Sequence, residues 1–201
     1  DVGFETYQKI LNEAITELRE TEPVEQDTAV PSLKAQPALR PDKTYVSDFQ
    51  IDTDLEIMFP DEYVSNISER IRLYKELNEI GNEETLHTFV NKLTDRFGPL
   101  PPPAADLVDI VRIKWIAVRL GVEKILLKNN LLIANFISDP DSQFYKSSLF
   151  ISIMNYIGQK HGQMAVKQKD SKLSLTIKEI KSVKAAIQIL NSILQGIESK
   201  N

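Results

Sequence analysis

The sequence predicts an α+β domain that follows a helix and a linker. Polar and apolar residues alternate strictly over residues 49–59, as in a half-buried strand. Apolar residues then recur at helical spacing over residues 65–120. After Gly121 come two pairs of short apolar runs, and a helical segment follows each pair. The predicted order is βααα-ββαββα, with an antiparallel or mixed sheet and helices packed on one side of it.

The N-terminal part predicts an appendage to this domain. Residues 4–19 place their apolar side chains on one face of an amphipathic helix, and residues 21–47 are Pro-rich, acidic and without an apolar period. We therefore divide the chain into a helix at 1–20, a flexible linker at 21–47 and a domain at 48–201. The chain lacks an initiator Met and is expected to begin partway through a longer protein. The first helix then packs either on a preceding domain or back on the domain that follows.

The strand predicted at 49–59 carries Asp52, Asp54 and Glu56 on its polar side. Alternate residues of a strand lie about 6.6–7 Å apart, which is too far for these carboxylates alone to hold one metal ion. We favour a charged face that discourages edge pairing over a metal site.

Three helices are predicted between residues 65 and 120. The first begins at Asn66, whose spacing to Glu69 resembles a capping box, and its apolar face comprises Ile67, Ile71, Tyr74 and Leu77. Gly81 ends that helix and Asn82 caps the next. The second helix buries Leu86, Phe89, Val90, Leu93 and Phe97, and the third buries Leu107, Val108, Val111, Trp115 and Val118.

A sharp corner joins the second and third of these helices. Gly98 is placed where a helix ends in a left-handed residue, and Pro99 prevents the helix from continuing. The prolines at 101–103 suit the first turn of a new helix. Asp95 and Arg96 lie just before the corner and off the apolar face. They are either contacts for a partner or ordinary solvated charges.

The last third predicts two hairpins and two helices. Strands at 122–128 and 131–137 flank Asn129-Asn130, which suits a tight turn with positive φ angles. A helix at 147–160 precedes a second hairpin around Asp170-Ser171, and a helix at 182–197 ends the domain.

Composition and motifs indicate a noncatalytic interaction domain. There is no cysteine, no P-loop, no dinucleotide fingerprint and no run of about 18 apolar residues that could span a membrane. A polar helix face or a helix end accounts for His87 and His161. The net charge is −5, although residues 121–201 alone carry +5. Lys167, Lys169 and Lys181 keep an accessory nucleic-acid-binding role open, but an acidic chain argues against it.

Several motifs, in the same order, resemble the C-terminal domain of bacterial transcription-repair coupling factor. They are FQIDTDLEIMFPD at 49–61, ISERIRLY at 67–74 and LTDRFGPLPPP at 93–103. The opening, GFETYQKILNEAITEL at 3–18, is similar to the segment that closes the translocase motor of the same protein. The resemblance covers the whole chain and is weaker after Gly121.

This resemblance implies a regulatory function. The parent protein would be a cytoplasmic, ATP-driven DNA translocase that displaces stalled RNA polymerase and recruits nucleotide excision repair through UvrA. Its ATP and Mg site would lie upstream, so this fragment is expected to be no enzyme and to hold no cofactor. The domain would dock on the N-terminal UvrB-like module, cover the UvrA-binding surface and restrain the motor until RNA polymerase is engaged. Asp95 and Arg96 match the family's docking motif, whereas Lys92 stands where some relatives are expected to be acidic.

Overall fold

The computed structural model describes residues 45–160, 162–169 and 172–199. They belong to one compact unit, Thr44–Asn201. The helix predicted at 1–20 and the linker up to residue 44 lie outside the described residues, so that division of the chain stays a prediction.

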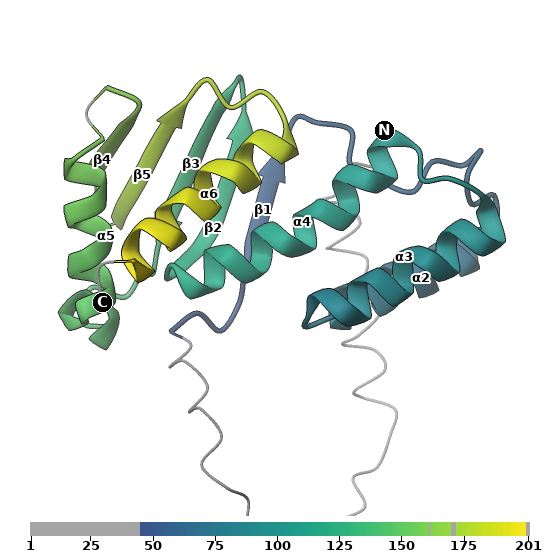
Figure 1. The fold of residues 1–201 in the computed structure, drawn as a ribbon, viewed down its shortest axis with the longest axis horizontal. Coiled ribbons are helices and arrows are strands. Elements are labelled where there is room, and N and C mark those ends of the chain that lie inside the picture. Colours follow the sequence, from purple (N-terminus) through teal and green to yellow (C-terminus); the bar gives the residue numbers. More distant parts are fainter. Residues whose placement is uncertain (1–44, 161, 170–171, 200–201) are drawn as a thin grey trace, which may run out of the picture. The chain divides into compact units, whose positions relative to one another are not determined.

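The unit is α+β, as predicted, and its sheet is mixed (Figure 1). The strands are β1 (Gln50–Thr53), β2 (Val122–Lys128), β3 (Leu131–Phe136), β4 (Met164–Lys169) and β5 (Lys172–Lys178). They lie in the order β1-β2-β3-β5-β4. β1 pairs with β2 in parallel, and every other pair is antiparallel.

The predicted strand at 49–59 was too long. β1 ends at Thr53, which pairs with Leu127, and β2 has only one further residue before its turn. Thr53 then directs the chain away, because its Oγ1 donates to the carbonyl of Leu127 and accepts from the amide of Leu55. Within the described chain no group of three or more acidic or His side chains could hold a metal ion.

The first hairpin has the predicted turn, because Asn129 and Asn130 adopt φ angles of 53° and 59°. The second hairpin pairs β4 with β5, and its turn at Asp170-Ser171 lies outside the described residues.

Two long helices, α4 (Pro102–Arg119) and α6 (Val183–Glu198), lie side by side over one face of the sheet (Figure 1). The helix α5 (Ser148–Gly158) packs on α6 near β4, after a short 3-10 helix, η1 (Gln143–Lys146). The core between helices and sheet is aliphatic, with a cluster of rings around Phe144 at one end.

The helices α2 (Ile67–Glu79) and α3 (Glu83–Phe97) complete the three-helix segment and pack beside α4 rather than on the sheet. The predicted cap residues Asn66 and Asn82 accept from the amides of Glu69 and Thr85 at 3.0 and 2.9 Å. Gly98 ends α3 with a positive φ of 85°, as predicted, but its ψ of −171° lies outside the left-handed helical region.

The predicted inner faces of α2 and α4 need correction. α2 buries Leu73 and Leu77, whereas Ile67 and Ile71 are 66% and 39% exposed. The buried stripe is rotated because α3 and α4 contact α2 over the side that carries Leu73. In α4, Trp115 is only half-buried, and its Nε1 donates to the carbonyl of Ile80 at 3.3 Å.

Candidate interaction surface

The three residues singled out from the sequence all lie in the last turns of α3, and all are exposed. The inner side of α3 is filled by Leu86, Phe89 and Leu93, which are no more than 2% exposed. Lys92, Asp95 and Arg96 therefore project from the rest of the helix circumference. Their positions agree with a contact surface, but position alone does not assign a role.

Two of the three side chains are already bound to α2. Nη1 of Arg96 lies 2.7 Å from Oε1 of Glu69, and Nζ of Lys92 lies 3.3 Å from Oε1 of Glu76. Glu69 also accepts from Arg72 at 2.6 Å. The hydrogen bond from Arg72, with further support from Arg96, lowers the pKa of Glu69 below its usual value.

Asp95 differs from its neighbours. Within the described part of the chain its exposed carboxylate has no hydrogen bond and no ion pair. It is thus the member of the predicted trio whose charge is not already compensated by another element of the domain.

The corner after α3 is held rigidly around Asp95. The Arg96 guanidinium lies over the Phe97 ring, 4.9 Å from its centroid. The ring of Tyr63 also packs against Phe97, with 5.7 Å between the two ring centroids. The hydroxyl of Tyr63 donates to the carbonyl of Gly98 at 2.9 Å. These contacts fix the end of α3, so a partner would meet a preorganised surface.

A groove of about 220 Å³ separates α2 and α3 next to these residues. It is lined by the charged residues Arg72, Glu76, Lys92 and Arg96 and by the apolar residues Leu73, Phe89, Leu93 and Phe97, of which only Phe97 is partly exposed. An apolar centre with a polar rim is the usual anatomy of a protein interface.

Sequence reasoning missed the contribution of α2. The spacing of Asn66 and Glu69 predicts only a cap. Glu69, Arg72 and Glu76, however, recur at i, i+3 and i+7 and so share one side of the helix. That spacing was the available signal. Which helix would face this charged side is a tertiary property that no local pattern contains.

The basic residues of the C-terminal third do not form one cluster. Lys167, Lys169, Lys172 and Lys178 share one face of the β4–β5 hairpin by their register. Lys184 lies on α6, on the opposite side of the sheet. His87 lies on the exposed side of α3 beside Asn91, and His161 lies outside the described residues.

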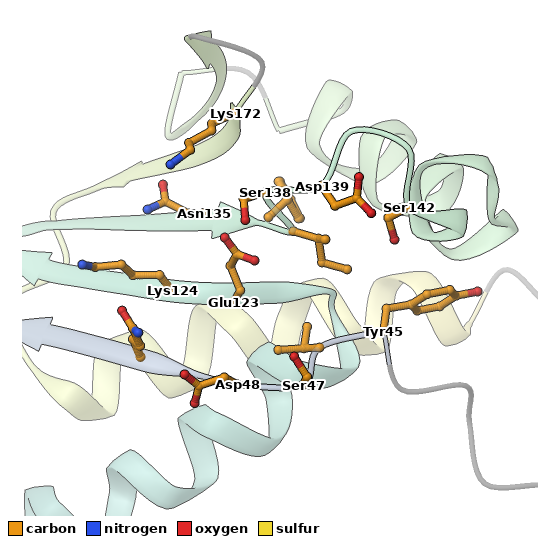
Figure 2. A pocket seen from close by; sticks show the side chains of 14 residues that line it. Tyr45, Ser47, Asp48, Glu123, Lys124, Asn135, Ser138, Asp139, Ser142 and Lys172 are labelled. Carbon is orange, nitrogen blue, oxygen red and sulfur yellow. The ribbon is translucent and has the colours of Figure 1, made fainter. Parts of the chain in front are cut away.

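A larger cavity of about 630 Å³ lies at the end of the sheet where β1 begins. Figure 2 shows its polar lining, in which Asp48, Glu123 and Asp139 lie near Lys124 and Lys172. Burial, together with the charges of Glu123 and Asp139, raises the pKa of the neighbouring Tyr145. No sequence pattern predicts this cavity. Among the described residues, no helix is long and apolar enough to cross a membrane.

Fold and surface together define an α+β domain with a helical arm that ends in a charged, preorganised corner. Residues 53–147 match the family model of the TRCF domain. The chain is 28% identical to the transcription-repair-coupling factor of Rickettsia typhi over 70% of its length, and 30% identical to that of Staphylococcus epidermidis over 62%. It spans only 11% and 9% of those proteins.

A solved structure described as the C-terminal domain of transcription-repair coupling factor has the same fold. The TM-score is 0.61 at 19% identity, over 77% of this chain and 97% of that one. Residues 53–147 are therefore similar to the TRCF domain, and the chain has the fold of the solved C-terminal domain of transcription-repair coupling factor. The resemblance inferred from the motifs is confirmed.

Proposed function

We propose that this domain is a noncatalytic regulator of a bacterial transcription-repair coupling factor, acting in transcription-coupled DNA repair in the cytoplasm. It docks on the N-terminal UvrB-like module of its own parent protein. In the docked state it covers the surface that UvrA needs and restrains the upstream DNA translocase. Engagement of RNA polymerase releases the domain and allows UvrA to bind.

The observation that supports this proposal is the carboxylate of Asp95, which is exposed in the last turns of α3 and has no ion pair among the described residues. It lies on the same helix as Lys92 and Arg96, which line the groove against α2. A basic side chain on the partner would find in Asp95 an acceptor that no other described residue occupies. Arg96 and Lys92 contribute differently, because each would have to share or leave its bond to Glu69 or Glu76.

A regulatory clamp must close and also reopen. Tethering the two surfaces on one chain gives an effective concentration of about a millimolar, so modest intrinsic affinity is enough. A few exposed charged contacts around a small apolar centre suit such an interface, since charges set register and specificity more than affinity.

The test is a calorimetric titration of this chain with the separately expressed UvrB-like module. We expect saturable binding that Asp95→Arg weakens at least about tenfold, roughly 1.4 kcal/mol. The matched control is Asp141→Arg, which reverses another exposed aspartate in the loop before η1. Equal weakening by both variants, or no binding at about 1 mM, would contradict docking through the α3 corner.

A further inference from the structure

The face of the sheet away from α4 and α6 carries an apolar row. By register, the apolar residues Leu126, Ile133 and Ala165 lie in one row on β2, β3 and β4. The buried Thr176 on β5 lies between Ile133 and Ala165, and Asp52 on β1 ends the row beside Leu126. Their neighbours on the other face, such as Ile125, Ala134 and Leu175, are the buried core residues. The apolar row therefore lies on the opposite face, which we call the open face.

Lysines flank this row on both sides. Lys124 and Lys167 lie in the row of residues on one side of it, and Lys128 and Lys178 lie in the row on the other side. Lys169 and Lys172 extend the first side at the end of the hairpin. Lys128 forms an ion pair with Asp52, whereas Lys167, Lys169, Lys172 and Lys178 are exposed. Figure 2 shows Lys124 and Lys172 projecting on the near side of the strands, with α6, in yellow, behind them.

The charge of the open face is opposite to that of the chain. Six lysines and Asp52 lie in these rows, in a protein whose net charge is −5. Asp48, Glu123 and Asp139 line the cavity at the β1 end of the same face, so the basic part is the β4–β5 side, with Lys167, Lys169, Lys172 and Lys178. A basic surface in an acidic chain selects for acidic partners through electrostatic complementarity. The apolar row between the lysines adds a requirement that a purely anionic ligand does not meet.

We propose that the open face binds an acidic amphipathic helix of a partner protein. The two lysine rows are separated by four residues along the strands, about 13–14 Å, and a helix with its side chains is about 10–12 Å wide. A helix lying along the apolar row would place its apolar stripe on Leu126 and Ile133 and its flanking carboxylates beside the lysines. Five strands span about 19 Å, or about 13 residues of helix.

The same surface fits nucleic acid less well. Phosphates gain nothing from an apolar row, and none of the residues in these rows is aromatic, as stacking of single-stranded bases would require. This inference concerns a different face from the α3 corner and does not depend on the proposed docking there.

The test is an amide NMR titration of the whole 201-residue chain with a synthetic peptide of about 14 residues. The peptide carries Leu at i, i+3, i+4 and i+7 and Glu on the flanks. A scrambled peptide of equal composition and a DNA duplex of about 20 bp, about 68 Å long and so longer than the surface, serve as comparisons. We expect shifts at Leu126, Ile133 and Lys178 with the amphipathic peptide only.

Charge reversal on the open face separates this binding from a general attraction. The double variant Lys167→Glu, Lys178→Glu should weaken the peptide at least about tenfold. Lys184→Glu, on α6, and Asp95→Arg should leave its affinity within about twofold. Equal binding of the scrambled peptide, tighter binding of the duplex, or no response at about 1 mM peptide would overturn the proposal.

Discussion

Asp95 carries a different role from Arg96 and Lys92 in this account, although the three residues lie within one turn and a half of α3. Arg96 and Lys92 bind Glu69 and Glu76, so their charges already serve the contact between α2 and α3. Removing either would change the domain itself as well as its surface. Asp95 has no such partner in the described chain, which makes it the cleanest site for a docking variant.

Substitutions at two glycines with positive φ angles distinguish the cost of backbone strain from the cost of a steric clash. A Cβ at Gly98, φ 85°, would meet nothing within 4 Å, whereas one at Gly121, φ 70°, would lie 2.2 Å from the Phe144 ring. We expect Gly98→Ala to cost about 1–3 kcal/mol of unfolding free energy, since its backbone, at φ 85° and ψ −171°, is one that essentially only glycine adopts. Gly121→Ala should cost more, because the buried ring must also move. Urea unfolding measures both, and equal costs would contradict the clash.

Phe144 is the centre of the ring cluster at one end of the core. It is fully buried, and its ring lies 5.3–5.9 Å from those of Tyr45, Phe136, Tyr145 and Phe150. We expect Phe144→Ala to destabilise the domain by about 3–5 kcal/mol in urea unfolding. Phe150→Ala, at a half-buried member of the cluster, should cost clearly less. A smaller loss at Phe144 than at Phe150 would contradict this packing.

At the scale of elements, the sequence patterns predicted the helices and hairpins because their signals are local. Cap residues such as Asn66 and Asn82, the turn at Asn129-Asn130 and the stop at Gly98 each depend on a few neighbouring residues. The end of β1 was not predictable in this way. It depends on where β2 turns, 74 residues further along the chain at the Thr53–Leu127 contact.

In the candidate surface, too, the features set by neighbouring residues were predictable and those set by distant contacts were not. The exposure of Asp95 and Arg96 followed from the apolar period of α3 and from Gly98. The ion pairs of Arg96 with Glu69 and of Lys92 with Glu76 did not follow from a local pattern, because they depend on how α2 packs against α3. The exposure of Ile67 and Ile71 was missed for the same reason. The open face of the sheet also required the strand order, which no local pattern contains.

The α2–α3 contact is expected to weaken in acid. Hydrogen bonds from Arg72 and Arg96 lower the pKa of Glu69 in the folded state. Its contribution is therefore fully present above the ordinary glutamate pKa of 4.5 and is lost as the pH falls through the lower folded value. Glu69→Gln should lower the urea midpoint slightly at pH 7, and the difference from the unaltered chain should disappear in stronger acid. Glu56→Gln, at an exposed glutamate, is the control, and a difference that persists in acid would contradict the ion pairs.

At the scale of the whole molecule, the domain presents two charged surfaces on different elements. The α3 corner offers the exposed carboxylate of Asp95, and the open face offers lysines beside an apolar row. A regulator with two separate surfaces could hold one partner while another competes for release. In the parent protein, the tether would make even a weak contact at the α3 corner effective.

We propose that the α3 corner masks the UvrA-binding surface. The most direct measurement is the affinity of UvrA for the full parent protein, compared between the unaltered chain, Asp95→Arg and the control Asp141→Arg. The account predicts that Asp95→Arg tightens UvrA binding at least about tenfold, because the masked surface opens more often, while the control leaves it unchanged. Unchanged UvrA affinity in the Asp95→Arg protein, or in a protein lacking residues 48–201, would contradict masking by this domain.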